Sequence, residues 1–470
     1  MKKIFFTLTM VFLSVYFADA GLAAEAGSPN GSLGRGSPPE TLTLDQARLL
    51  ALANSRSLAG YNLAIKSSQL TEKSRIYSNL PTLSLGASAS TGLWNSDEMG
   101  DTYFKDNLST GISIGVHQSI FDGGKSLVQK TLNSIAAEMA QKNALEGYFA
   151  VLYETDTAYY GVLQAAASLE SAESALQTAE LSLSTAEVRS QSGMMNAGDY
   201  LQALAEKETK ENARNQAKRD LLSSSVKLRN LTGLKETPVP EAFDFDTYEE
   251  LIKGLAALTD AETGVLYTNL LKTAAVNNPA LARAALSSQQ AEKNVTLATR
   301  EYVPTLSASV STGLNYSGAS GTAGGLRPFS GSLSLSGSIP LDFWVTANNV
   351  KQKQILRDQA ALNYLDAEEN LATELQTAFL GLITNAGSVL STRRAFEYAE
   401  KHFEYVMELF RLSQNSVAAL SDASALVSSN RNQLIRSQYG FLLSLSNIRK
   451  LGAFAEEDAL TALLLSASIR

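Results

Sequence analysis

Two segments of this chain, more than two hundred residues apart, carry almost the same alternating pattern. Leu80–Gly92 has the sequence LPTLSLGASASTG and Val303–Gly313 has the sequence VPTLSASVSTG. The segments that follow each of them, Leu108–His117 and Ser332–Ile339, also alternate apolar residues with Ser, Gly or His. Because successive side chains of a strand point to opposite faces, each half of the chain should contain a β-hairpin with one apolar face and one small polar face.

The polar face consists almost entirely of Ser and Gly, whereas a soluble sheet usually places Lys and Glu on its wet side. Small hydroxyl residues are typical of the water-filled interior of a barrel, and strands of about 10–14 residues suit a tilted crossing of a bilayer. Aromatic residues near the strand ends fit interfacial girdles. The alternative interpretation of this pattern is the edge of a soluble β-sandwich. We expect the lumen face to carry Ser84, Ser88, Ser113, His117, Ser307 and Ser334.

Four strands cannot close a membrane barrel. The smallest closed barrels have about eight strands, and an open edge in lipid leaves backbone groups without hydrogen bonds. Several copies of the chain should therefore each contribute four strands to one shared barrel.

Each hairpin is followed by a very long stretch without proline, Gly123–Ser192 in the first half and about Val345 to Ser413 in the second. A continuous helix of roughly 65–70 residues is about 100 Å long. In the first half, Val, Leu and Ala residues recur every seven positions, which indicates a coiled-coil seam: Val162, Leu169, Leu176 and Leu183, with Ala165, Ala172, Ala179 and Ala186. Helices longer than a bilayer is thick must extend into an aqueous space.

The repeat organises the whole chain. The N-terminus has Lys2 and Lys3, an apolar run and then small residues around Ala20, which predicts an exported protein with a cleaved signal peptide. The predicted segments are a signal peptide (1–20), a disordered leader (21–40), a first repeat (41–234, hairpin 82–120), an acidic linker (235–265), a second repeat (266–454, hairpin 305–340) and a C-terminal tail (455–470).

Composition excludes several classes of function. The chain has a net charge of −8 and no cysteine. It therefore offers no basic stripe for nucleic acid, no disulfide or thiolate metal site, and no cysteine for lipid attachment. Its only histidines, His117 and His402, are too isolated for a metal or catalytic constellation. We expect no metal, no cofactor and no enzyme activity.

Shorter motifs add to this architecture: IFDGGK at Ile120–Lys125, GMMNAGDYLQA at Gly193–Ala203 and LRNLTGL at Leu228–Leu234. Together with the repeat, the hairpins and the long helices, they make the chain resemble the TolC-like outer-membrane efflux proteins. The resemblance implies an α+β membrane protein whose homotrimer forms a β-barrel, with four strands per protomer, surrounded by outer-membrane lipid. A long antiparallel α-helical barrel, built from the two repeats, would continue it into the periplasm.

The same resemblance implies a function and partners. The trimer would be the passive outer-membrane channel of a tripartite efflux or type I secretion system, exporting small molecules or polypeptides. It would work with a periplasmic adaptor (membrane fusion) protein and an inner-membrane pump of the RND or ABC type. A trimeric coiled-coil surface adhesin with a β-barrel anchor is the alternative, but it would gather its strands at one terminus, whereas here hairpins interrupt both halves.

The resemblance also implies a gate at the periplasmic tip, where each long helix turns into a shorter one. Gly193 matches the glycine that opens this turn, and Asp199 matches the aspartate that begins the next helix. The equivalent positions in the second half are Asn415, expected in left-handed geometry, and Ser421 with Asp422 beside it. A helix N-cap is the equally simple interpretation of Asp199.

Overall fold

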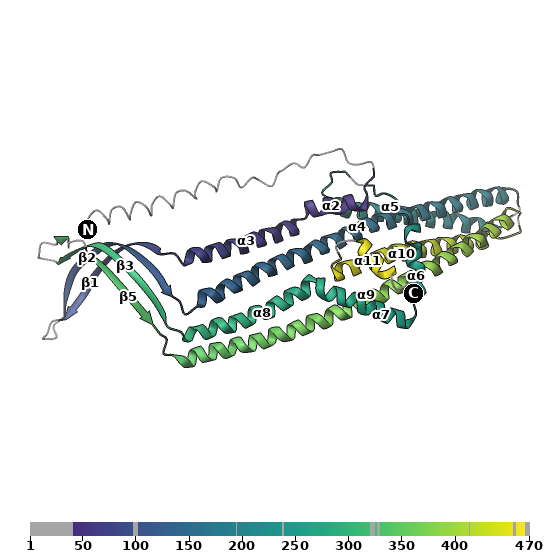
Figure 1. The fold of residues 1–470 in the computed structure, drawn as a ribbon. Coiled ribbons are helices and arrows are strands. Elements are labelled where there is room, and N and C mark those ends of the chain that lie inside the picture. The colour runs from purple at the N-terminus through teal and green to yellow at the C-terminus, as the bar shows by residue number, and fades with distance from the viewer. Residues whose placement is uncertain are drawn as a thin grey trace. The chain divides into compact units, whose positions relative to one another are not determined.

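A computed structural model describes residues 41–96, 102–193, 195–236, 239–319, 325–326, 330–412, 414–454 and 457–465. The predicted signal peptide (1–20) and leader (21–40) lie outside these residues. Leu42–Arg470 forms one compact unit, and all elements below belong to it, with the labels of Figure 1.

In the first repeat, a broken helix leads into a hairpin, and the hairpin leads into a long helix followed by a shorter one (Figure 1). The elements are α2 (Leu44–Asn54), α3 (Arg56–Ser78), β1 (Thr82–Ser96), β2 (Thr102–Phe121), α4 (Lys125–Gln191) and α5 (Ala197–Thr232). The 67 residues of α4 correspond to about 100 Å of helix.

The second repeat has the same order. Its elements are α7 (Asp260–Asn277), α8 (Pro279–Thr299), η2 (Arg300–Tyr302), β3 (Thr305–Ala319), β4 (Gly325–Leu326), β5 (Ser330–Ser338), α9 (Phe343–Arg411) and α10 (Val417–Gly452). Between the repeats lie η1 (Asp246–Tyr248) and α6 (Glu249–Ala256), inside the segment predicted as a linker. Beyond α10, the predicted tail contains helix α11 (Glu457–Leu465), which buries Leu460 and Leu464.

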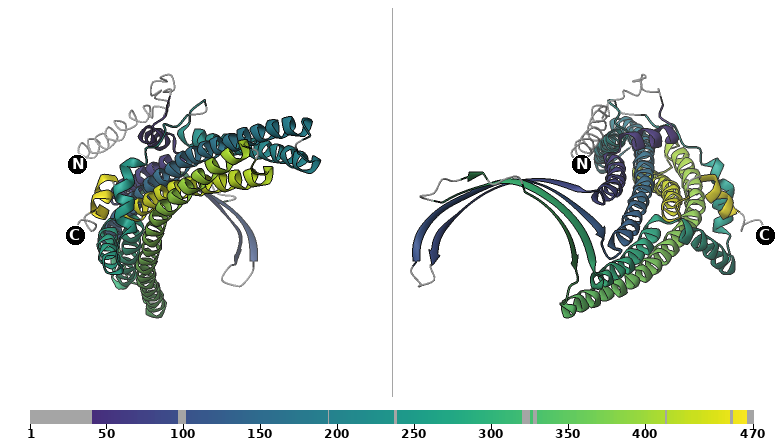
Figure 2. Two further views of the ribbon diagram at one scale, coloured as in Figure 1. Left: turned by 90° about the vertical axis from the view of Figure 1, so that its right-hand side faces the viewer. Right: turned by 60° about the vertical axis from the view of Figure 1, so that its left-hand side comes forward.

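The long strands form one antiparallel sheet in the order β1-β2-β3-β5, with the two-residue β4 also beside β3. The hairpin of one repeat joins the hairpin of the other through β2 and β3, where Val116 is opposite Val310. Figure 2 shows the sheet as a curved layer whose strands continue into the helices. The outer strands β1 and β5 each have one paired side in the described residues.

The helices continue the order of the strands. Next to the sheet, α3 packs on α4, α4 on α8 and α8 on α9; farther along, α5 packs on α4, α4 on α10 and α10 on α9 (Figure 1). The long helix of the first repeat therefore contacts helices of both repeats. None of the helices in the described ranges is long and apolar enough to cross a membrane.

The main hydrophobic core lies where the linker and the short helices pack on α4, α9 and α10. It buries Tyr159 and Tyr160 of α4, Leu251 and Leu255 of α6, and Phe441 of α10. An aromatic cluster joins the linker to this core, with the rings of Tyr160 and Phe243 edge to face at 5.7 Å. The two repeats are thus held together by a shared core.

Candidate functional site

The polar face of the sheet carries all six residues that the sequence predicted for the lumen. His117 of β2 is opposite Thr82 of β1 on one side and Ser309 of β3 on the other, and Ser309 is opposite Ser334 of β5. Because side chains alternate along a strand, Ser84 and Ser88 share the face of Thr82, Ser113 that of His117, and Ser307 that of Ser309. Their place along a lumen is a prediction.

The other face of the sheet is apolar and exposed. Leu83, Leu85, Leu333 and Leu335 each leave between 67% and 78% of their surface uncovered. A contiguous apolar patch of this kind on a folded chain marks an interaction surface, and a strand face of Leu, Ile, Val and Ala is what a bilayer contacts on a barrel.

Exposed aromatic residues gather where strands become helices. Tyr77 lies at the end of α3, and Phe343 and Trp344 begin α9, with Trp344 70% exposed. The ring of Tyr302 stacks on that of Phe343 at 6.3 Å. The amphipathic rings of Tyr and Trp at this level fit the boundary between lipid and water.

The turn at the end of α4 is built by a glycine and an asparagine. Gly193 has a φ of 72°, the left-handed conformation that favours glycine. Asn196 caps α5, because its Oδ1 accepts the N–H of Asp199 at 2.8 Å, while its amide donates to the Asp199 carboxylate at 2.9 Å. Asp199 is therefore not the N-cap; it stands at the third helical position and holds the cap in place.

The turn at the end of α9 departs from the predicted alignment. Ser416 caps α10 by accepting the N–H of Ala419, so the two caps, Asn196 and Ser416, are 220 residues apart rather than 222. Among the described residues outside glycine, only Ala453 has a positive φ. The expectation of left-handed geometry at Asn415 is therefore wrong.

With this corrected offset, Ala419 takes the place of Asp199, and Ser421 and Asp422 lie in the second turn of α10. The alignment of the two turn sequences was two residues off, because the hydrogen bond of the cap, which fixes where the helix begins, cannot be read from similarity alone. The first repeat alone thus has a carboxylate in the opening turn of this helix.

Arg189, in the last turn of α4, joins the two tips. Its guanidinium donates to the backbone carbonyl of Phe410 in α9 and lies over the ring of Phe410, 4.6 Å from the centroid. A cation is favourable at a helix C-terminus, where carbonyl groups lack partners. Beneath it, Ala186, Ala203, Val406, Val417 and Leu420 form a small apolar core.

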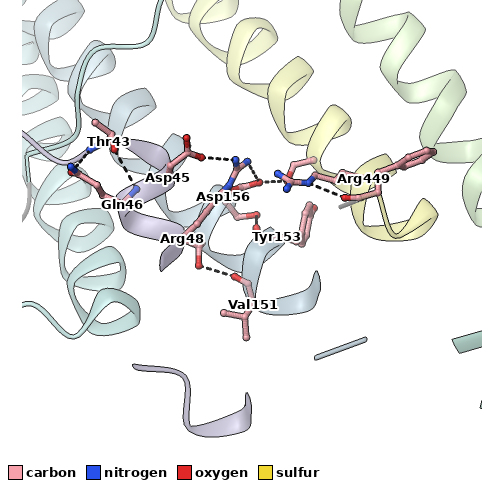
Figure 3. A network of polar contacts seen from close by, with 12 residues as sticks. Thr43, Asp45, Gln46, Arg48, Val151, Tyr153, Asp156 and Arg449 are labelled. Atoms are coloured by element: carbon pink, nitrogen blue, oxygen red, sulfur yellow. Dashed lines mark hydrogen bonds and ion pairs between the residues drawn. The ribbon is translucent and has the colours of Figure 1, made fainter. Parts of the chain in front are cut away.

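A buried ion pair lies near the middle of α4 (Figure 3). Arg48 of α2 donates to both carboxylate oxygens of Asp156, at 2.7 and 2.8 Å, and the hydroxyl of Ser446 in α10 donates to the same carboxylate. Asp156 is fully buried, and Arg48 also contacts Asp45 at 3.3 Å. The pair therefore links α2, α4 and the second repeat.

Sequence reasoning missed this network, although a signal was present. Asp156 stands among buried neighbours at helical spacing, Leu152 before it and Tyr159, Tyr160 and Leu163 after it. A carboxylate at such a position requires a partner.

Tyr159 ties the start of the unit to the linker. Its hydroxyl donates to the carbonyls of Leu42, at 3.0 Å, and Glu241, at 3.2 Å. Burial, followed by the charge of Glu241, raises the pKa of Tyr159 to about 12, so the hydroxyl keeps the proton that it donates.

The residues that the structure describes contain no group of three His, Cys, Asp or Glu side chains able to hold a metal ion. His117 lies on the sheet and His402 on α9. The candidate site therefore has two parts. One is the sheet with its polar and apolar faces, which we call the wall. The other is the tip, formed by the two turns that follow α4 and α9.

Comparison with known proteins gives this architecture a family. The family model described as outer membrane efflux protein matches residues 48–234 and 270–452. The chain is 25% identical to outer membrane protein TolC of Escherichia coli over 392 residues, covering 81% of this chain and 76% of TolC. Its fold is similar to the CmeC outer membrane channel of Campylobacter jejuni, with a TM-score of 0.70 and 15% identity, covering 90% of this chain and 89% of CmeC. It is also similar to the MtrE outer membrane channel of Neisseria gonorrhoeae, with a TM-score of 0.66 and 15% identity, covering 87% and 88% of the two chains.

These matches confirm the predicted fold class and the prediction that the chain is a passive channel rather than an enzyme. TolC-like channels are passive homotrimers of the outer membrane with a helical barrel in the periplasm, and they work with periplasmic adaptor proteins and inner-membrane pumps. Because the family model covers both repeats, the chain belongs to the outer membrane efflux protein family.

Proposed function

We propose that this efflux channel is the outer-membrane duct of a tripartite efflux or type I secretion system, and that the hydroxyl face of its sheet lines the water-filled passage. The observation that carries this proposal is one sheet with a small polar face, an exposed apolar face and two outer strands that, among the described residues, each lack a neighbour on one side. Cargo, either small molecules or polypeptides, is delivered by the pump through the adaptor. The duct itself supplies no energy.

Closure of the barrel follows from the edges. Each copy presents β1 at one edge and β5 at the other, and a head-to-tail ring pairs unlike edges. The helices that adjoin these strands carry exposed apolar residues seven positions apart, Leu63 and Leu70 on α3 and Ile355 and Leu362 on α9. A spacing of seven keeps residues on one face of a helix. Three copies, as in the family, then bury both the strand edges and these stripes.

The gate is the pair of helical turns at the tip, with Gly193, Asp199, Asn415, Ser421 and Asp422 around it. Opening separates the hairpin of α4 and α5 from that of α9 and α10. Arg189 resists this separation through its bonds to Phe410, since a hydrogen bond from a charged group contributes about 1.5–3 kcal/mol and a cation–π contact about 0.5–1 kcal/mol.

Single-channel recording in planar bilayers tests the channel and its gate together. The purified wild-type protein should conduct, whereas an adhesin should not. Arg189→Ala should open more often or conduct more than wild type. Arg219→Ala is the matched control, because Arg219 contacts only the nearby Gln216 on α5 among the bonds described. Equal behaviour of both variants would remove Arg189 from the gate.

Asp199→Ala tests the carboxylate that braces the cap at Asn196. Loss of this contact should loosen the first turn of α5 and weaken the closed state, with a smaller increase in opening than Arg189→Ala gives. Unchanged conductance and closed-state lifetime would remove the proposed gating role of Asp199.

A further inference from the structure

Among its described side chains, the polar face of the sheet has almost no group larger than a hydroxymethyl. The register of the strands places twenty residues with described side chains on this face: thirteen serines, four glycines, two threonines and one histidine. They are Thr82, Ser84, Gly86, Ser88 and Ser90 of β1; Ser109, Gly111, Ser113, Gly115, His117 and Ser119 of β2; Thr305, Ser307, Ser309, Ser311 and Gly313 of β3; and Ser332, Ser334, Ser336 and Ser338 of β5.

Charged residues are absent from most of the length of these strands on both faces; the exceptions are Lys105 and Asp106 near the start of β2. The tracts 76–96, 107–121, 302–326 and 328–341 contain no Asp, Glu, Lys or Arg. Ser113 lies seven residues from Asp106 and nine from Asp122, which is about 23–30 Å at the rise of a strand. At physiological ionic strength the Debye length is about 8 Å. The middle of the wall is therefore beyond the reach of the charges at the ends of its own strands.

The serines also bond to the wall itself. The hydroxyls of Ser309 and Ser334 are 2.7 Å apart, those of Ser311 and Ser332 are 2.8 Å apart, and Ser84 donates to the carbonyl of Gly115. Several serines also face a glycine on the next strand. A Cβ on Gly115 would come within 2.8 Å of the Ser84 hydroxyl, so these pairs have no room for a longer side chain without a shift. The polar face of the wall therefore carries short hydroxyl side chains, and some of these are hydrogen-bonded to one another or to the backbone.

Most charges of the chain lie elsewhere. The sequence contains 47 Asp and Glu against 39 Lys and Arg, and exposed carboxylates recur along the helices, for example Glu173, Glu180 and Glu187 at every seventh residue of α4. A field that attracts or repels an ion requires such fixed charges close to its path.

We propose that the membrane-spanning wall is electrostatically neutral along its middle and does not select cargo by charge there, so that any charge preference of the channel arises in its helical part or at the charged hairpin ends. This inference rests on the proposed function, because it takes the polar face as the lining of the passage. The wall then admits cationic, anionic and uncharged polar solutes alike and retains none of them by an ionic contact.

The chain has no cysteine, so single cysteines can measure the potential at the wall. Ser113→Cys in the reconstituted full-length protein is treated with a cationic and an anionic methanethiosulfonate reagent of similar size. The ratio of the two rates should lie within about twofold of the ratio for a free thiol in the same buffer. Adding Ser311→Asp, diagonally across from Ser113, should shift the ratio several-fold toward the cationic reagent and so establish the sensitivity of the assay.

Ile112→Cys, one residue away on the opposite face, is the matched control and should react with neither reagent. If Ser113→Cys reacts but its ratio departs about tenfold from that of the free thiol, the neutral wall is wrong although the channel stands. If Ile112→Cys reacts and Ser113→Cys does not, the polar face does not line the passage, and the proposed function fails with it.

Discussion

The two repeats build the same joints between helices from different side chains. Where α2 meets α3, two residues supply the hydrogen bonds. The amide of Asn54 donates to the carbonyls of Asn230 and Leu231 at the end of α5, at 3.3 and 3.2 Å. The hydroxyl of Ser55 caps α3. Where α7 meets α8, one residue suffices. Asn278 donates to the carbonyl of Leu451 at 2.8 Å, and its Oδ1 caps α8.

The duplication thus retains the hydrogen bonds that the backbone needs rather than the residues that supply them. The end of a helix leaves carbonyl and N–H groups without partners, and in both repeats an asparagine at the break in the first helix supplies one for the last helix. Helices α5 and α10 then end in the same left-handed conformation, at Gly233 and Ala453, although only the first of these is a glycine.

The interiors differ more than the joints. Counting the offset of 220 that the caps define, Gln376 stands in α9 where Asp156 stands in α4, and Gln376 is exposed. The same offset relates Asp122 and Asp342 before the two long helices, but only Asp122 accepts hydrogen bonds from the helix start. Four variant pairs test how far the repeats have diverged.

The largest difference should be between Asp156→Ala and Gln376→Ala. Removing Asp156 takes from the guanidinium of Arg48 its buried carboxylate partner, and breaking a buried ion pair costs about 3–5 kcal/mol. Removing an exposed Gln376 should change the free energy of unfolding by less than about 0.5 kcal/mol. Thermal unfolding of the trimer in detergent measures both. Arg48→Met combined with Asp156→Leu should recover most of the loss, and a loss as large as that of Asp156→Ala would show that the apolar core cannot accept the pair's replacement.

Asn278→Ala should cost more than Asn54→Ala, because Asn278 serves two helices. Loss of an N-cap costs about 1 kcal/mol and loss of a further hydrogen bond about 1 kcal/mol. We therefore expect roughly 2 kcal/mol for Asn278→Ala and about 1 kcal/mol for Asn54→Ala, whose two hydrogen bonds are longer and exposed to water, measured by the same unfolding assay. Equal losses would mean that the cap on α8 contributes nothing beyond the following Pro279.

The helix ends predict opposite signs. Ala453→Gly should stabilise the protein by about 0.5–1 kcal/mol, since a φ of 50° strains an L-residue and suits glycine. Gly233→Ala should destabilise it by about 1 kcal/mol or more, because its new Cβ would lie 2.7 Å from the side chain of Asn54 and displace that amide from its carbonyls. Unfolding midpoints that move in the same direction for both variants would contradict the equivalence of the two ends.

Much of this architecture could be predicted from local pattern. The period of two along Leu83–Ala89 identified the faces of the sheet, because alternation in a strand leaves no other arrangement. The absence of proline from Gly123 to Ser192 gave the length of α4 to within a few residues. The four-strand argument gave an oligomer, though not the number three, which came from the resemblance.

What escaped prediction depends on contacts between distant segments or on single hydrogen bonds. Arg48 and Asp156 are 108 residues apart, and nothing in the sequence of either segment indicates that these two side chains form an ion pair. The break between α2 and α3 depends on the cap at Ser55, and the shift of two residues at the second turn depends on the cap at Ser416. Helix α11 was missed because its nine residues are too few for a clear period.

The smallest difference concerns the starts of α4 and α9, and it depends on pH. Partial burial of Asp122 raises its pKa, but the bonds from the N–H and hydroxyl of Ser126 and from the N–H of Gly124 outweigh this effect and hold the pKa below its ordinary value. A carboxyl group with a lowered pKa in the folded state stabilises that state fully above about pH 4, and the contribution is lost as the pH falls through the folded-state pKa. Asp122→Asn should therefore lower the unfolding midpoint at pH 7 by more than at pH 3. Asp342→Asn should change it little at either pH, because Asp342 makes no cap bond with its side chain. An equal response of the two variants to acid would show that the carboxylate of Asp122 does not stabilise the start of α4. The two repeats would then not differ in stability at this point.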